Sequence, residues 1–476
     1  MPKATTPSFI LELPLKMGSK NERQILHRFE IKRRLYNAVL GELLIRLKRR
    51  NTQSAWFEAL KIENLTQRRD ALKAINKEYG FTENDAQKYL LSICQNNGFK
   101  GVLGSMEVQV IASNVFKTVN KRSMGKCGAP RFKGKNSVSS LENKSNTTGL
   151  RFRKESGLVT WTGVVFPVFH KRDGTSSYIQ EALENETKYC RILYRNIKGK
   201  RRWFLQLIQK GLAPQKYRVA NGEVGLDVGP QTIAIVSDTT MSLEKFAPSV
   251  EQPWAKQRIL QRTLDRSRRA TNPHCFKEDG TWIKGAKITV RSKKYQETRQ
   301  KNQEIERVLR ERRKRDHGNL VNRVLSHGNV IKSEKLSYIA WQKNFGRSVK
   351  VRAPASFLNK LRYKAEKAGG EWIDLRTQKL KLSQLDHCTQ TYQKKPLKQR
   401  WHTLGDGSGL VQRDVYSALL ALHSEDNVVH CSKVGDYLAS AQAFLELSPW
   451  TRKETANVSS LLAHGFMLAT PERIGN

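Results

Sequence analysis

The chain has 476 residues and carries 86 lysines and arginines against 43 aspartates and glutamates, which gives a formal net charge of +43. Such an excess of one sign makes a compact protein repel itself, so it indicates a polyanionic partner and predicts a nucleic-acid-binding protein. Hydrophobic residues still make up 38 % of the chain, which excludes a basic disordered tail, and no stretch approaches the ~18 consecutive apolar residues that a membrane helix needs.

The cysteines and the first residues of the chain indicate where the protein works. The six cysteines are scattered without paired spacing, which indicates reduced thiols rather than a disulfide framework. The beginning of the chain contains a short alternating apolar run and no secretion signal. We therefore expect a cytoplasmic protein associated with the nucleoid and without a membrane partner, and the sequence leaves its oligomeric state open.

The N-terminal quarter is predicted to be mostly helical. Residues 8–16 are predicted to form a strand, and residues 21–120 to form helices. In the first helix, basic residues lie between apolar residues that recur near the helical period, namely Ile25, Phe29, Leu35, Val39 and Leu43. This pattern fits either a helical bundle that faces nucleic acid or an ordinary bundle with a solvated basic face, and the total charge favours the first.

A region rich in short strands follows a basic loop near residues 125–135. The strand-type runs are 149–153, 158–161, 164–169, 189–194 and 202–208, and a hairpin-like turn joins the last two. Strands at this spacing predict a small barrel or a sandwich. The alternatives are a charged hairpin without a partner and a surface that binds a phosphate backbone. The candidate contact residues are Arg131, Lys133, Lys135, Arg201 and Arg202.

Residues 256–316 form a third, strongly basic stretch. Apolar residues near both ends predict two helices, with a glycine-containing loop between them. This stretch again fits either a nucleic-acid-binding face or a solvated coil.

Three acidic residues stand out against the basic background. Asp227 lies in a predicted buried strand, Val224–Val228, and a return strand is predicted at Thr232–Ser237. A buried carboxylate costs several kcal/mol unless an arginine or a bound cation compensates it. Glu334 ends a short apolar strand, and Asp414 opens an apolar helix. Taken singly, Glu334 also fits a surface charge, and Asp414 fits an acid that favours the helix dipole.

In this order the acids resemble the three RuvC-like motifs of the TnpB family and the related type V CRISPR effector nucleases. The local matches are Gly225-Leu-Asp227-Val-Gly, Ser333-Glu334-Lys-Leu and Arg413-Asp414-Val-Tyr-Ser-Ala. The order of the other features matches too, with a strand, a basic helical region, a β-rich region and a basic helical stretch between the first two motifs. The resemblance therefore covers nearly the whole chain.

The resemblance implies an RNA-guided DNA endonuclease with a guide RNA and target DNA as partners. It implies that Asp227, Glu334 and Asp414 are the catalytic, metal-holding residues, and that two Mg²⁺ ions support phosphodiester hydrolysis, since magnesium prefers carboxylate, water and phosphate oxygens. Arg413 fits a contact with a nucleic-acid phosphate or, equally well, a surface charge.

The fold class that the resemblance implies is multidomain α+β. Residues 1–20 and 127–220 would form a small wedge-like β-barrel module, and residues 21–126 a helical recognition lobe. Residues 221–476 would form an RNase H/RuvC-like α/β nuclease domain. A basic helical insert at about 254–316 and a target-nucleic-acid loop at about 385–410 would interrupt it. A helical middle is predicted for the tail, 431–476.

The chain departs from the family in the loop before the third motif. Related proteins often carry two CxxC pairs there, but the corresponding positions hold Tyr392, Lys395, Leu404 and Gly407. Four thiolate ligands are therefore missing, and we do not expect zinc, although His387, Cys388 and His402 remain nearby. We expect the loop to pack through Tyr392, Pro396 and Trp401 instead.

Three other functions fit parts of the sequence. The first is an RNA-guided DNA-binding protein that acts without cleavage, although all three acids are present. The second is a basic structural or RNA-binding protein whose acids are ordinary salt-bridge partners. The third is a transposase that joins strands with a carboxylate triad on a similar fold.

Overall fold

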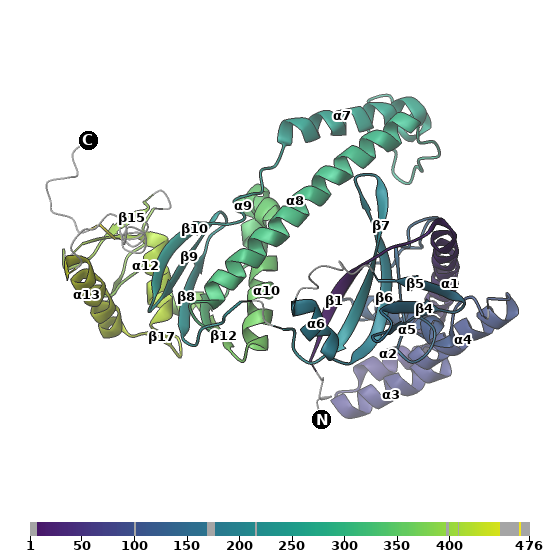
Figure 1. Cartoon of the computed structure of the whole chain (residues 1–476), viewed down its shortest axis with the longest axis horizontal. Helices are drawn as coiled ribbons and strands as arrows, with labels where there is room; N and C mark the ends of the chain where they lie inside the picture. Colours follow the sequence, from purple (N-terminus) through teal and green to yellow (C-terminus); the bar gives the residue numbers. More distant parts are fainter. Residues whose placement is uncertain are drawn as a thin grey trace. The chain divides into compact units, whose positions relative to one another are not determined.

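The computed structural model describes residues 7–99, 101–168, 177–214, 217–396, 399–407, 409–447 and 466–467 (Figure 1). The chain divides into two compact units, Met1–Lys216 and Tyr217–Asn476. Among the described residues, no helix is long and apolar enough to cross a membrane.

The first unit begins with a strand and then builds a helical layer. The apolar residues predicted for the first helix are all buried, from Ile25 to Leu43, so its inward face is confirmed. Asn64 and Thr82 cap two of the following helices by accepting bonds from backbone N–H groups in the first turn. The helices are α1 (Ser19–Asn51), α2 (Ser54–Lys61), α3 (Leu65–Glu78), α4 (Glu83–Asn96), α5 (Ser105–Ser123) and α6 (Ser177–Glu184).

Seven strands of the first unit form two antiparallel sheets. Alternate residues of β1 are buried, and they share one apolar core with α1 and α5. A two-residue turn, Lys198-Gly199, joins β6 to β7 with positive φ at both positions, as the predicted hairpin requires. The first sheet has the order β1 (Ser8–Leu15), β7 (Lys200–Lys210), β6 (Thr187–Ile197), β2 (Ser140–Glu142), and the second holds β3 (Arg151–Arg153), β4 (Leu158–Trp161) and β5 (Val164–Pro167).

A five-stranded mixed sheet organises the second unit. β11 runs parallel to both β8 and β12, whereas β8, β9 and β10 are antiparallel. Both faces are covered, so β9 is an almost continuous apolar run. The strand order is β10 (Thr240–Lys245), β9 (Thr232–Ser237), β8 (Glu223–Val228), β11 (Val330–Glu334), β12 (Glu371–Leu375).

Helices cover the two faces of this sheet. One apolar cluster joins a face of the sheet to α12 (Arg413–Leu422), and a second joins the other face to α8 (Lys293–Leu325) and α10 (Pro354–Lys367). Figure 1 shows α12 on one side of β8 and β9 and α8 on the other. α7 (Trp254–Thr271) returns along α8, so the two predicted basic helices form a hairpin.

Short elements connect these layers and end the described chain. α9 (Tyr338–Arg352) is kinked at Phe345, where φ is −127°. The predicted helix of the tail is confirmed as α13. The remaining elements are a 3-10 turn (Pro273–Cys275), α11 (Thr377–Leu380), β13 (Leu385–Asp386), β14 (Thr391–Tyr392), β15 (Trp401–Thr403), β16 (Leu410–Gln412), β17 (Ser424–Glu425), β18 (Val428–Val429), α13 (Cys431–Leu447) and β19 (Phe466–Met467).

Candidate nuclease site

Two of the three predicted acids lie on neighbouring parallel strands. β8 and β11 pair in register up to Leu226 and Ser333. Asp227 and Glu334 are the next residue on each strand, so they leave the sheet on the same face and at the same end. The parallel pairing thus brings together two carboxylates that are far apart in the sequence.

The third acid comes from the helix that covers this face. Asp227 of β8 lies opposite Ala234 of the neighbouring strand β9. Ala234 packs in the same apolar cluster as the residues of α12. At Gly225 the helix touches the strand, because a Cβ there would lie 2.1 Å from the carbonyl oxygen of Ala418. Asp414 precedes Ala418 by four residues, or about 6 Å along the helix. Its carboxylate is close enough to Asp227 to raise the pKa of that residue.

The N-terminus of α12 is fixed by local bonds. The Gln412 side chain caps the helix by accepting from the backbone N–H of Val415 at 2.8 Å. The Arg413 Nη1 atom donates to the carbonyl of Pro396 at 3.3 Å. Asp414 is not isolated, because Arg400 Nη1 lies 3.7 Å from its carboxylate.

Like charges dominate the electrostatics around Asp227. Burial raises the pKa of Asp227 well above its usual value, and the Asp414 and Glu334 carboxylates raise it further, while Arg413 opposes them. Burial also raises the pKa of Glu334, although the backbone N–H of Leu382 donates to its carboxylate and lowers the pKa in part. Asp227 and Glu334 therefore lie at one end of two central strands, with Asp414 of α12 beside Asp227, and Arg400 and Arg413 compensate this negative charge only in part.

The donor set fits a hard divalent cation. Asp227, Glu334 and Asp414 offer only carboxylate oxygens, which are the ligands that Mg²⁺ prefers. Their oxygens do not all lie within 4.8 Å of one another, since among the described residues only Asp386, His387 and Cys388 form a group that tight. Two ions ~3.5–4 Å apart would not require the carboxylates to meet at one point.

Lys332 supports the site and was missed in the sequence. It lies two residues before Glu334 in the sequence and is 1 % exposed. Its Nζ atom pairs with Glu223 at 2.7 Å and donates to the carbonyl of Leu422 at 2.9 Å, which ties β11 to the end of α12. The alternation of β11 was the available signal, because it places Lys332 on the same face as Glu334.

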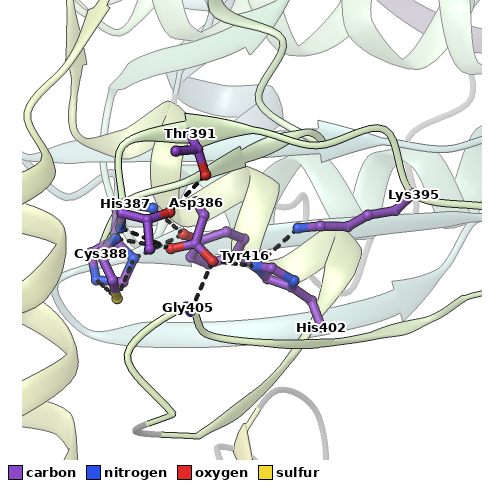
Figure 2. Close-up of polar contacts among 9 residues, drawn as sticks. Asp386, His387, Cys388, Thr391, Lys395, His402, Gly405 and Tyr416 are labelled. Carbon is purple, nitrogen blue, oxygen red and sulfur yellow. Dashed lines mark hydrogen bonds and ion pairs between the residues drawn. The ribbon is translucent and has the colours of Figure 1, made fainter.

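The loop before α12 is organised by the Asp386 carboxylate (Figure 2). This carboxylate accepts from the backbone N–H groups of Cys388 at 3.0 Å, Thr389 at 3.4 Å and Gly405 at 3.0 Å. It also lies 3.3 Å from Nε2 of His402. A single buried side chain therefore holds the two ends of the loop together.

A second set of contacts joins the loop to α12. The Tyr416 hydroxyl lies 2.8 Å from Nδ1 of His387 and accepts from the His387 backbone N–H at 2.9 Å. Lys395 Nζ lies 2.9 Å from Nε2 of His402, as Figure 2 shows. Because a lysine ammonium can only donate, His402 Nε2 accepts this bond. Burial lowers the pKa of His402, and Lys395 lowers it further.

The prediction for the packing of this loop was wrong. Tyr392 is 52 % exposed and Pro396 is exposed, while Trp401 is half-buried. Polar contacts centred on Asp386 and Tyr416 replace the expected aromatic packing. Asp386 and Tyr416 were not singled out in the sequence, where the polar residues around Asp386 give no sign that it is buried.

Asp386, His387 and Cys388 offer a weak possible metal site. Their ligand atoms all lie within 4.8 Å of one another. However, the Asp386 carboxylate already accepts three backbone bonds, and Tyr416 occupies Nδ1 of His387. Burial and the nearby Asp406 raise the pKa of the Cys388 thiol to about 12, which favours the neutral thiol over the thiolate that a metal needs.

The predicted nucleic-acid contacts of the first unit lie in two places. Arg131 and Lys135 are exposed on the loop after α5, where Lys133 is half-buried with its Nζ atom 4.0 Å from the centre of the Tyr36 ring. At the start of β7, Arg202 is exposed, and Arg201 pairs with Glu22 at 2.9 Å. Arg413 belongs to the second unit, beside the acids.

The fold is that of a multidomain protein with mixed helices and sheets. The protein in the cryo-EM structure of the Cas12f1–sgRNA–target DNA complex is similar to it, at 12 % sequence identity and a TM-score of 0.50, over 88 % of this chain and 98 % of that chain. A cryo-EM structure of a CRISPR–Cas12f ternary complex matches 86 % of each chain at 14 % identity, but its TM-score of 0.28 is too low to indicate a shared fold. No protein-family model and no curated protein matches the chain. The likeness to Cas12f1 at this identity shows the fold alone.

Proposed function

We propose that this protein is an RNA-guided DNA endonuclease of the TnpB-like and compact type V kind, with a RuvC-like site at Asp227, Glu334 and Asp414. One observation carries the proposal: Asp227 and Glu334 leave adjacent parallel strands on the face where α12 presents Asp414. Three neighbouring carboxylates repel one another and do not evidently stabilise the fold, although the chain as a whole has a net charge of +43.

In this proposal the three carboxylates hold two Mg²⁺ ions. Bound Mg²⁺ supplies an activated water and neutralises the charge that develops on the scissile phosphate. The residues of the chain position the reaction. Lys332 and Gly225 fix α12 against the sheet, and Arg413, beside Asp414, offers a cation to a neighbouring phosphate.

A guide RNA and a target DNA are the proposed partners. The net charge supports a polyanionic partner, and the fold is similar to that of a protein solved with an sgRNA and target DNA. Base pairing with the guide would then read the target sequence, and the protein would read the shape of the heteroduplex and a short flanking motif. The proposed backbone contacts are Arg131, Lys133, Lys135, Arg201, Arg202 and Arg413.

Cleavage of a plasmid tests the proposal. The protein is purified with its copurifying RNA, the RNA is sequenced, and a plasmid carrying the matching target is incubated with Mg²⁺ or with EDTA. We expect Mg²⁺-dependent cleavage by the wild type and a loss of on the order of a hundredfold or more in Asp227→Ala, equal to ~3 kcal/mol of transition-state stabilisation. Asp238→Ala, which removes an exposed acid at the end of β9, is the matched control and should cut normally.

The alternatives give different outcomes in the same experiment. Equal cutting by the wild type and Asp227→Ala would reject the site. Guide-dependent target binding without cutting would support an RNA-guided binder, and joined strands would support a transposase. An affinity that depends on salt concentration but is the same for every RNA would support a general RNA-binding protein.

A further inference from the structure

A cavity of about 360 Å³ lies between α7 and α9 in the second unit. On α7, residues spaced three and four apart lie on one helix face, and on α9 the two lining residues follow the kink at Phe345. The cavity is lined by Trp254, Gln257, Arg258, Gln261, Arg347 and Lys350.

Neighbouring elements fix both walls of the cavity. Gln257 is 4 % exposed, and its side chain accepts from Gln252 at 2.7 Å and donates to Glu306 of α8 at 2.8 Å. On the other wall, Arg313 of α8 donates to the carbonyls of Lys350 at 3.0 Å and Val351 at 2.9 Å. These bonds attach α7 and α9 to the same helix, so both walls of the cavity are anchored on α8.

The α9 wall is also attached to the strand that carries the first acid. Ser348 donates to the carbonyl of Pro230 at 2.6 Å, in the turn between β8 and β9. Pro230 follows Asp227 by three residues. The α9 wall of the cavity is therefore joined to the turn that follows Asp227.

The lining combines an aromatic face with uncompensated positive charge. Trp254 is 46 % exposed at the first position of α7. Among the described residues, no ion pair involves Arg258, Arg347 or Lys350, and the lining contains no carboxylate. An indole face that can stack a base and nearby cations that can hold a phosphate form the recognition set of single-stranded nucleic-acid binders.

We propose that this cavity binds one unpaired nucleotide of a single-stranded nucleic acid, with the base on Trp254 and its phosphate between Arg258, Arg347 and Lys350. The buried Gln257 keeps the α7 wall in place, and the Gln261 amide faces the edge of the base. The inference rests on the proposed nucleic-acid partner and not on cleavage, so it is tested without Mg²⁺.

Fluorescence anisotropy with labelled oligonucleotides tests the proposal on the full chain. The protein, freed of copurifying RNA in high salt, is titrated in EDTA into U12 RNA, dT12 DNA or a 12-bp DNA duplex. We expect Trp254→Ala to weaken binding of a single strand roughly 5- to 150-fold, from ~1–3 kcal/mol per stacked base, and to change duplex binding less than about twofold. Trp254→Phe should retain most of the affinity.

Two further variants separate stacking from charge. Trp282→Ala removes another exposed tryptophan of the same unit, which packs on Phe276 instead, and should bind normally. Replacing Arg347 and Lys350 together with glutamine should lower the salt dependence of binding, with a slope smaller by about 0.7 per lost phosphate contact. Trp254→Ala should leave that slope unchanged.

Unchanged single-strand affinity in Trp254→Ala, or an equal loss for the duplex, would overturn the proposal. Stronger binding of either U12 or dT12 would support it and identify the strand as RNA or DNA. If the wild type bound no oligonucleotide, both the cavity and the nucleic-acid partner would be rejected. If Trp254→Ala weakens single-strand binding but the wild type does not cleave its target, only the nuclease assignment would be rejected.

Discussion

Asp227 and Glu334 follow the last paired residues of β8 and β11, Leu226 and Ser333, and so occupy equivalent positions on two parallel strands. No loop sets their separation, because the strands of a sheet lie ~4.8 Å apart. The repulsion between these acids, with Asp414 added, is therefore built into the core of the second unit and has measurable consequences.

The first prediction is that Asp227→Asn stabilises the second unit when no divalent cation is present. The pKa of Asp227 is raised, so this group favours the folded state only while it is protonated and destabilises it as the pH rises through that raised pKa. At pH 7.5 in EDTA the variant should melt ~2–4 °C higher than the wild type, the range that 1–2 kcal/mol produces in a unit of this size.

Mg²⁺ provides the control for this prediction. The ion should raise the thermal midpoint of the wild type and have a smaller effect on Asp227→Asn, because the neutral amide is a poorer ligand. Equal shifts in both proteins, or a variant that melts lower than the wild type in EDTA, would contradict the proposed role of Asp227.

The second prediction concerns the contact between α12 and β8. In Gly225→Ala the new Cβ would lie 2.1 Å from the Ala418 oxygen and 2.5 Å from the Leu422 nitrogen, and both atoms belong to the backbone. The helix must move, so we expect a loss of roughly 2–4 kcal/mol in the free energy of unfolding, as for overpacked cores, and loss of cleavage. Gly346→Ala, where no atom lies within 4 Å of the added Cβ, should fold and melt like the wild type.

The third prediction is a dependence of stability on pH that comes from His317 of α8. Its ring packs edge-on against the rings of both Phe246 and Phe357, and its Nε2–H donates to the carbonyl of Arg352 at 2.8 Å. Its pKa is lowered from the usual 6.5 to about 4, mainly by burial and also by Arg313 and Lys360, whereas the Arg352 carbonyl and Asp316 oppose the change.

The sign of this effect follows from the lowered pKa. The neutral ring favours the folded state fully above pH 6.5, and this contribution, ~3 kcal/mol, is lost as the pH falls from 6.5 toward 4. The thermal midpoint of the wild type should thus fall more between pH 7.5 and 5 than that of His317→Phe, even if the variant melts lower at pH 7.5. His274→Gln, at an exposed position, should follow the wild type, and parallel curves for all three proteins would refute the prediction.

The fourth prediction is that Asp386 controls the order of the loop before α12. Asp386→Ala leaves the backbone N–H groups of Cys388, Thr389 and Gly405 without their acceptor, at ~1–3 kcal/mol for each donor that stays buried. Hydrogen exchange at these amides should accelerate, while exchange in β8 and β11 stays slow. Asp436→Ala, an exposed acid of α13, should change neither, and unchanged exchange in Asp386→Ala would remove its assigned role.

Predictions from the sequence were most accurate where the residues of one short segment define both its secondary structure and its unusual residue. Asp227 could be found because a carboxylate in an apolar strand is unusual, and β9 was predicted at Thr232–Ser237, as observed. Glu334 was harder to identify as a site residue, because the strand that carries it contains Lys332 and so does not look buried in the sequence. Lys332 is buried through its contacts with β8 and α12, which lie far away in the sequence. The loop was predicted wrongly for the same reason: Asp386 satisfies N–H groups at both ends of the loop, and no local pattern shows such a closure.

The hairpin of α7 and α8 lies within the connection between β10 and β11, and hence between the first two acids in the sequence. The first α8 residue in an apolar core cluster is Leu309, so the beginning of this helix at Lys293 lies ~24 Å farther out. The pairing of β8 with β11 is made by strand residues alone, at positions that the far part of the hairpin does not touch. The tip of the hairpin, residues 272–292, is therefore where another domain could be grafted without displacing Asp227 or Glu334.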